Sequence, residues 1–531
     1  FYDIFCYNIC GFYTFLRGKN MGNITETITN INTVINDFVW VKVGFILLLG
    51  TGILLTLCTK FFQLRHIVHW WKNTIGSVFK KNSSSTKKTD KQTISQFQAL
   101  CTALAATIGT GNIAGVAAAI VIGGPGAVFW MWIAAFFGMM TKFSENVLGI
   151  YFRRRNSKGE WSGGAMYYLE DGFGKKIKSR ATGRVLGIAF AICAILASFG
   201  IGNMGQVNKI TLNIQSAFFA NVDAPQIGGV SVINIIIGVV LMVIAALIII
   251  GGLQRIAAVA ERVVPLMAVL YIIGALIVFL TNITRVEAMF TSIFKFAFGI
   301  KAVGGAAVGI AFKEVATQGC KRGIFSNEAG LGSSVMVHSA SNVKEPVRQG
   351  MWGIFEVFFD TFVVCTITAI VVLSSGYIDL ETGLAVSGVN DATLVAQTFG
   401  NAFGKGGEIF IALAMLLFAF TTVLGWSQYG TKAVEYLFGE KAVPVYRVIF
   451  VLMIISGAVM TSSLAWDISD TFNGMMMIPN LIGVLFLFPL VMKITKNYVE
   501  RKIRGKDIEP ILSYDKNIQK ETAESIKNGE E

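Results

Sequence analysis

Long runs of apolar residues restrict what this chain can fold into more than any other feature of its sequence. The runs are 21 to 39 residues long, and an α-helix needs about 20 residues to cross the hydrocarbon core of a bilayer. Hydrophobic residues make up 54% of the 531 residues and charged residues only 15%, whereas soluble domains are about 25% charged. The sequence therefore predicts an all-α, polytopic membrane protein, and it excludes a cytosolic enzyme, a disordered chain and a coiled coil.

The apolar runs predict eleven transmembrane helices. They cover residues 39–59, 97–121, 125–151, 185–215, 228–250, 257–281, 302–340, 350–374, 408–435, 444–464 and 474–495. The seventh run is the least regular, because it is rich in glycine and contains charged residues such as Lys313 and Lys321. We retain it as a span, since without it the later basic and acidic loops would fall on the wrong sides of the membrane.

The loops alternate in charge along the chain. Residues 60–96 carry eight Lys or Arg and one acid, residues 152–184 carry nine and three, and the tail after 495 begins with a basic stretch. The opposite loops are poor in Lys and Arg, and they are 122–124, 216–227, 375–407 and 465–473. The positive-inside rule then predicts a plasma-membrane protein with an external N-terminus and a cytoplasmic C-terminus. The net charge of +13 is a topology signal, and nucleic acid is not expected as a partner.

The first 20 residues do not continue this pattern. In common codons, residues 17–20 read as a ribosome-binding site just before Met21. We expect 1–20 to be a translated leader, with a genuine N-terminal extension as the alternative. The rest divides into an extra N-terminal helix with its cytoplasmic loop (21–96), two five-helix repeats (97–300 and 301–495) and a cytoplasmic tail (496–531).

Two of the predicted helices are interrupted by glycine and polar residues. The second span contains Gly109, Thr110, Gly111 and Asn112, and the seventh contains the stretch 326–333, SNEAGLGS. Unwinding frees backbone N–H and C=O groups, which are tolerated at membrane depth only where they line a cavity or meet a ligand. Each interrupted helix is the first of five spans, and interruptions at matching positions of two halves are typical of a transporter site. Because five is odd, the two halves form an inverted repeat.

The two ends of such a break have opposite polarity. A half-helix that starts after Gly111 presents free N–H groups, which attract a carboxylate. The half-helix that ends near Ile108 presents free carbonyls, which suit a cation or an ammonium group. The break therefore predicts a site for a zwitterionic amino acid and a small cation.

Polar side chains on two other spans are candidate partners of this site. Thr421 and Thr422 in the ninth span are either bonded to their own helix or oxygen ligands for sodium. Trp426 shares a face with Thr422 and is expected to cap a pocket. Gln206 in the fourth span is an uncharged polar residue at membrane depth and a candidate substrate contact.

Several strings of residues resemble the alanine or glycine:cation symporter family, also called sodium:alanine symporters. They are FQALCTALAATIGTGNIAGVAAAI (97–120), GGPGAVFWMW (123–132), SGGAMYYLE (162–170), FGIGNMGQ (199–206), GIFSNEAGLGS (323–333) and FAFTTVLGWSQYG (418–430). The resemblance implies a leucine-transporter-type fold, with one helix added before a five-plus-five inverted repeat. It also implies sodium-driven uptake of alanine or glycine, without a bound cofactor.

The resemblance also assigns residues to roles. It implies that substrate lies among Gly109, Thr110, Gly111, Asn112, Gln206, Asn327, Thr422 and Trp426. By analogy with the fold, it implies that sodium is held by the carbonyls of Ala105 and Ile108 and the hydroxyls of Thr421 and Thr422.

Charged residues inside the predicted spans each allow more than one role. Asp360 is a candidate for ion coupling or for a structural hydrogen bond. Glu328 is either a gate or the cap of a half-helix, and His338 is expected to be solvated. The sequence thus predicts a sodium-coupled symporter, with a proton-coupled symporter that depends on Asp360 as the alternative. A channel or an intramembrane enzyme is disfavoured.

Overall fold

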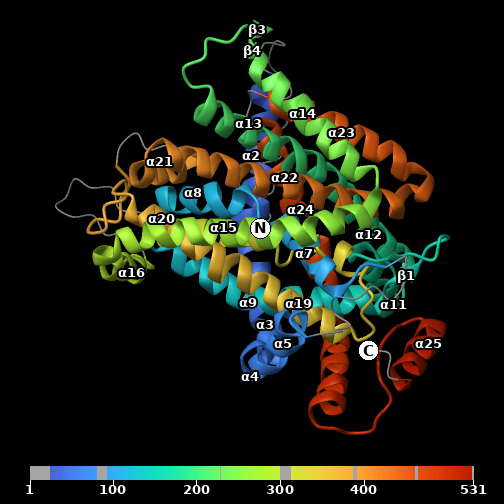
Figure 1. Ribbon diagram of the computed structural model, residues 1–531. Coiled ribbons are helices and arrows are strands. Elements are labelled where there is room, and N and C mark those ends of the chain that lie inside the picture. Colours follow the sequence, from blue (N-terminus) through green and yellow to red (C-terminus); the bar gives the residue numbers. More distant parts are fainter. Residues whose placement is uncertain are drawn as a thin grey trace, which may run out of the picture.

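The computed structural model describes residues 24–80, 86, 93–227, 229–298, 312–386, 391–460 and 464–528. The predicted leader, residues 1–20, lies outside these ranges. Within them the chain is mostly helical, as the apolar runs predict (Figure 1). In the element labels η denotes a π-helix, except that η6 and η8 are 3₁₀-helices.

The N-terminal part is one long helix followed by three short ones. The long helix comprises α2 (Ile24–Asp37), η2 (Phe38–Gly44) and α3 (Phe45–Cys58), and the short ones are α4 (Phe62–Arg65), α5 (Ile67–Asn73) and α6 (Ile75–Val78). The chain reverses between α3 and α4 through Lys60 and Phe61, both with positive φ. Helix α2 packs along α24, and α3 packs against α9.

The next 200 residues contain the first group of apolar helices. The elements are α7 (Gln96–Thr107), η3 (Gly111–Gly115), α8 (Val116–Gly123), α9 (Ala127–Tyr151), β1 (Arg154–Arg155), β2 (Trp161–Ser162), α10 (Ala165–Tyr167), η4 (Tyr168–Phe173), α11 (Gly174–Lys176), α12 (Arg180–Phe199), η5 (Gly200–Met204), α13 (Gly205–Phe218), β3 (Gln226–Ile227), β4 (Val230–Ser231), α14 (Val232–Ile249), α15 (Gly252–Thr281), η6 (Ile283–Arg285) and α16 (Val286–Lys295). Strands β1 and β2 form one antiparallel hairpin, and β3 and β4 form another.

The second group follows residue 311. Its elements are α17 (Phe312–Asn327), α18 (Val335–His338), α19 (Pro346–Val357), η7 (Phe358–Cys365), α20 (Thr366–Ser374), α21 (Asp391–Phe403), α22 (Lys405–Phe438), η8 (Glu440–Ala442), α23 (Val443–Val459), α24 (Leu464–Tyr498), η9 (Val499–Ile503) and α25 (Lys516–Lys527).

Nine helices in the described ranges are long and apolar enough to cross a membrane. The bent pair formed by Gln96–Thr107 and Gly111–Gly123 makes a tenth. These ten correspond in order to ten of the eleven predicted spans. The seventh predicted span, 302–340, does not form one straight apolar helix: residues 299–311 lie outside the described ranges, and α17 and α18 are separated by non-helical residues. The count of eleven and the repeat therefore stay predictions.

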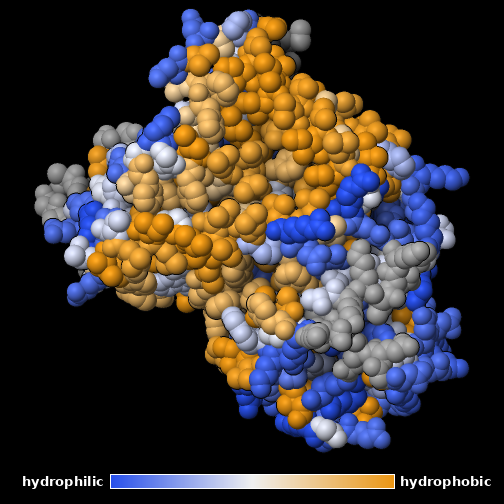
Figure 2. Space-filling model, in the orientation of Figure 1, coloured by the Kyte–Doolittle hydropathy of each residue, from blue (hydrophilic) through white to orange (hydrophobic). Residues whose placement is uncertain are grey.

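The surface separates an apolar region from a polar end. Figure 2 shows hydrophobic side chains gathered over α14, α15 and α23, and hydrophilic side chains around the β1 hairpin and α25. Exposed apolar residues on these three helices are Ile236, Val240, Leu247, Leu266, Val269, Ile273, Leu280, Val445, Val448 and Leu452. Large exposed apolar surface of this kind is what a helix facing lipid requires.

The C-terminal tail docks on the polar end. The Tyr514 N–H donates to the Tyr151 carbonyl at 3.1 Å, and Arg155 pairs with Glu521 at 2.7 Å. Arg501 forms a bidentate ion pair with Glu345, in which both N–O distances are 2.8 Å. The tail thus joins the loop after α9 to the loop after α18.

Two glycines of α3 give a matched test of how this helix packs. A Cβ on Gly52 would lie 2.8 Å from the backbone oxygen of Phe137 in α9, whereas a Cβ on Gly50 would have no atom within 4 Å. We expect Gly52→Ala to destabilise the protein by about 1–3 kcal/mol, because the two helices must move apart. Thermal unfolding in detergent measures this effect, with Gly50→Ala as the control. Equal midpoints for the two variants would show that α3 does not pack on α9 in this way.

Candidate functional site

The helix break predicted in the second span is confirmed in position. Helix α7 starts with a capping box, because the Ser95 Oγ accepts the N–H of Gln98 and the Gln98 side chain accepts the N–H of Ser95. The helix ends at Thr107, Ile108 is extended, and the chain resumes as η3 at Gly111. The two halves are bent by 55°.

The freed backbone groups of this break bond to side chains. The N–H of Gly109 donates to the Asn112 Oδ1 at 2.9 Å, and the N–H of Thr110 donates to the Gln206 Oε1 at 3.4 Å. Gln206 is itself held by a bond from its Nε2 to the Ile201 carbonyl in η5, at 3.1 Å. Since 3.4 Å is long for an N–H···O bond, the Thr110 N–H is only weakly satisfied.

The predicted sodium ligands are brought together only in part. The Thr422 Oγ1 lies 3.4 Å from the Ile108 carbonyl and also bonds the Phe418 carbonyl. The Thr421 Oγ1 instead bonds the Phe418 carbonyl at 2.9 Å and lies 3.5 Å from the Met267 sulfur of α15. Ala105 is fully buried near the end of α7. Thr422 and Ile108 therefore meet across α22 and the break, while the Thr421 hydroxyl is oriented towards α15.

A second break separates α17 from α18, as the sequence predicts. Helix α17 ends at Asn327, and Glu328, Gly330 and Gly332 then have φ values of 55°, 94° and 74°. Positive φ is uncommon for a residue with a side chain and is found where the surroundings hold it in place. The Glu328 carboxylate accepts the Ser333 hydroxyl at 2.5 Å, so it spans the turn of this break.

Asp360 joins the two breaks. This residue of η7 accepts the Asn112 Nδ2 at 2.7 Å from the first break and the Ser326 Oγ at 2.9 Å from the second. The Thr361 Oγ1 also donates to Asp360 at 2.9 Å and in turn accepts the Asn327 Nδ2 at 3.0 Å. All five side chains are fully buried. Three π-helical segments, η3, η5 and η7, supply or adjoin this network, and π geometry is frequent at functional sites.

Sequence reasoning missed two members of this network. Ser326 and Thr361 were not selected, although Ser326 lies within the glycine-rich stretch and Thr361 follows Asp360. The available signal was a hydroxyl beside an intramembrane carboxylate, because a buried carboxylate needs donors.

Two aromatic side chains pack closely against glycines of η5 and η3. Trp426 is buried against Gly202 of η5, where a Cβ would clash with the Trp426 side chain, and it contacts Tyr429 edge-on at 5.2 Å. The Phe325 ring of α17 lies 3.2 Å from the Cβ position of Gly111. Phe325 was also not selected from the sequence.

A separate ionic network corrects the expectation that His338 is solvated. His338 is fully buried, with its Nε2 2.9 Å from the Glu356 carboxylate and its Nδ1 2.6 Å from the Gln349 amide nitrogen. Lys142 pairs with Glu356 at 3.3 Å and donates to the Ser334 Oγ at 2.8 Å. Burial is possible because each charge has an opposite or hydrogen-bonding partner. The network ties α9 to α18 and α19.

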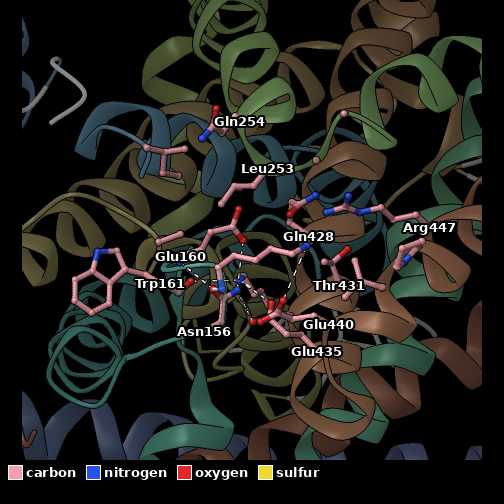
Figure 3. Close-up of a pocket in the computed structure, with 18 residues that line it drawn as sticks. Asn156, Glu160, Trp161, Leu253, Gln254, Gln428, Thr431, Glu435, Glu440 and Arg447 are labelled. Atoms are coloured by element: carbon pink, nitrogen blue, oxygen red, sulfur yellow. Dashed lines mark hydrogen bonds and ion pairs between the residues drawn. The ribbon is translucent and has the colours of Figure 1, made fainter. Parts of the chain in front are cut away.

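A polar cavity of about 280 Å³ lies further along α22 (Figure 3). Gln428 and Thr431 line it, and Gln428 is six residues beyond Thr422, or about 9 Å along the helix. Lys432 donates to the Trp161 carbonyl at 3.2 Å and pairs with Glu435 at 2.8 Å, so the loop between β1 and β2 closes one side of the cavity.

Comparison with protein families gives one match over most of the chain. The model of the sodium:alanine symporter family matches residues 25–511. The sodium/alanine symporter AgcS of Methanococcus maripaludis is 43% identical over 91% of this chain and 100% of that protein. The probable sodium/glutamine symporter GlnT of Bacillus subtilis is 36% identical over 91% of this chain and 93% of that protein.

A solved structure shares the fold. The crystal structure of MhsT in complex with L-phenylalanine aligns with a TM-score of 0.50 and 16% identity, over 77% of this chain and 99% of that one. This likeness supports the leucine-transporter-type fold expected from the sequence, and at this identity it shows the fold alone.

The buried Lys142–Glu356 pair gives a prediction for stability. We expect Lys142→Met and Glu356→Gln each to cost about 3–5 kcal/mol, because either change removes the opposite charge from a fully buried partner. The double variant is expected to cost much less than the sum, and unfolding midpoints in detergent measure this coupling. The control is Lys405→Met, which breaks the exposed pair with Glu408 and is expected to cost at most about 1 kcal/mol. Additive losses in the double variant would contradict the pairing.

Proposed function

The chain belongs to the sodium:alanine symporter family, and from this premise we propose that it imports alanine, glycine or similarly small neutral amino acids together with sodium by alternating access. Its relatives are secondary transporters, so the chain is a membrane transporter for amino acids and cations and not an enzyme. The sodium dependence and the small substrates are the parts that we propose.

The observation that carries the proposal is the pair of helix breaks joined through Asp360. Asn112 and Ser326 come from two helices more than 200 residues apart in the chain, and both donate to this one carboxylate. The break beside Asn112 offers an N–H of Thr110 at one end and the Ile108 carbonyl at the other. An amino-acid carboxylate suits the first group, and a cation suits the second.

We place sodium between the broken helix and α22. The proposed ligands are the carbonyls of Ala105 and Ile108 with the hydroxyls of Thr421 and Thr422. The Thr422–Ile108 distance of 3.4 Å supports this place, because a sodium ion between two oxygens would replace a weak hydrogen bond. To bind the ion, the Thr421 hydroxyl would have to give up its hydrogen bond to the Phe418 carbonyl. Sodium there would tie α22 to the break and complete the amino-acid site.

We place the substrate beside Gly109, Thr110, Gly111 and Asn112, with Gln206, Asn327, Thr422 and Trp426 around it. The Phe325 ring leaves little room near Gly111, which favours a small side chain, since a pocket rejects larger substrates sterically. The polar cavity beside Gln428 lies on the same helix and supports an exit towards the side with the basic loops.

The proposed architecture has eleven spans, with the N-terminus outside and the C-terminus in the cytoplasm. Helices α17 and α18 with the residues between them would form the broken seventh span. Spans two to six and seven to eleven would then be inverted repeats, and the helix of α2, η2 and α3 would be the additional span.

Proton coupling is the second candidate, because Asp360 is a buried carboxylate between the two breaks. In that mechanism Asp360 would carry the coupled proton, and the hydroxyls of α22 would matter less. The oxygen atoms around the first break favour sodium.

Uptake into proteoliposomes separates the two couplings. We expect labelled alanine to accumulate when sodium is higher outside, and not when sodium is equal on both sides or absent. An inward proton gradient without sodium should produce no accumulation. Accumulation driven by protons alone would favour the Asp360 mechanism, and uptake indifferent to both gradients would overturn symport.

The sodium ligand on α22 has its own test. Thr422→Ala is expected to raise the sodium concentration for half-maximal uptake about ten-fold or more, because a hydrogen-bonding group to a charge contributes about 1.5–3 kcal/mol. Ser427→Ala is the control, since the Ser427 hydroxyl bonds the Leu424 carbonyl of its own helix. An unchanged sodium response in Thr422→Ala would remove this residue from the site.

A further inference from the structure

A cavity of about 400 Å³ lies where two membrane-spanning helices end. It is bounded by the end of α3, by α4 and by the last turns of α24 with η9. In Figure 1 α4 and α5 lie just beyond the end of α3. The cavity is therefore at the boundary between the apolar spans and water, and no residue of either helix break lines it.

The charge of this cavity is strongly positive. Lys60, Arg65, Lys496 and Arg504 line it, against one acid, Glu500. Glu500 is paired with Lys506 at 3.6 Å, and none of the four cations forms an ion pair with another residue in the described part of the chain.

The pKa of a neighbouring histidine is lowered beside these cations. Burial lowers the pKa of His66, and the charges of Arg65 and Arg504 lower it further. His66 also lines the cavity. The cations that line the cavity, and not His66, are therefore the groups that would bind an anion.

An exposed apolar face adjoins the cations. Leu64, Ile67, Val68 and Trp71 are 52%, 49%, 62% and 44% exposed. Within α5 the spacing places Ile67, Val68 and Trp71 on one side of the helix. Leu64 of α4 adds to this exposed surface, whereas Trp70 is buried. A basic segment with such a face is typical of a helix that lies in the membrane interface. Free phosphate has no apolar part that could contact this surface.

We propose that this cavity binds the headgroup phosphate of an anionic phospholipid, with the acyl chains along the apolar face of α4 and α5. Basic pockets between spans at the cytoplasmic face are suited to such headgroups. The lipid would connect α3, part of the additional N-terminal helix, to the end of α24. Its assignment to the inner leaflet rests on the orientation proposed above, whereas the site itself does not.

Lipid binding to the full-length protein in neutral detergent tests the site. The probe is fluorescent phosphatidylglycerol, with phosphatidylcholine as the neutral lipid and inorganic phosphate as competitor. We expect saturable binding of phosphatidylglycerol that the triple variant Arg65→Gln, Lys496→Gln, Arg504→Gln weakens on the order of a hundred-fold, since each cation near the surface contributes about five-fold.

The matched control removes three exposed cations from the tail helix α25. Lys516→Gln, Lys520→Gln, Lys527→Gln changes the net charge equally and is expected to leave the affinity for phosphatidylglycerol unchanged. Equal loss of affinity in both triple variants would show that general charge attraction, and not the pocket, binds the lipid. Displacement of the lipid by inorganic phosphate would show that the cavity is a phosphate site. Equal binding of phosphatidylcholine would also overturn the proposal.

Unfolding midpoints of both variants check that the fold is retained. If the lipid-site variant does not fold, Arg65→Gln alone is measured, with an expected loss of about five-fold. Because binding in detergent is independent of sodium, uptake and orientation, its failure would leave the proposed transport untouched. Failure of sodium-driven uptake would equally leave the lipid site in place.

Discussion

Backbone hydrogen bonding at membrane depth is the constraint on which the rest of this structure depends. A helix that is interrupted inside the apolar region must find partners for its freed groups. Here Asn112 bonds the N–H of Gly109, Gln206 bonds the N–H of Thr110, and Asp360 then holds Asn112. The π-helical segments η3 and η7 carry Asn112 and Asp360, and η5 ends just before Gln206. This arrangement costs free energy, because polar groups are buried, and it creates a polar centre in an otherwise apolar bundle.

Much of this was accessible from the sequence because the relevant signals are local. Run length predicted ten spans that the structure contains, and the glycines around Thr110 and after Asn327 predicted both breaks. Contacts between distant segments were harder to predict. Thr421 and Thr422 are adjacent in sequence, yet only the Thr422 hydroxyl is oriented towards Ile108, because a helix turns by about 100° per residue.

His338 illustrates why burial of charge is difficult to infer from a single chain. A histidine near the end of a polar stretch is typical of a solvated position. Its burial depends on Glu356 and Gln349, which are 18 and 11 residues away, and on Lys142 in another helix. Only the tertiary arrangement shows that these groups compensate one another. The same holds for Ser326 and Thr361, whose role follows from their distance to Asp360.

The buried Lys142–Glu356 pair has a consequence for how the molecule can change shape. Separating the two charges inside the bundle would leave Lys142 with the Ser334 hydroxyl and Glu356 with His338 in place of the opposite charge, at a cost of several kcal/mol. We therefore expect α9 and α19 to move together in a conformational change. We expect the hinge to lie elsewhere. The bend of 55° between α7 and α8 is the best candidate, because hydrogen bonds of 3.4 Å hold the chain only weakly there.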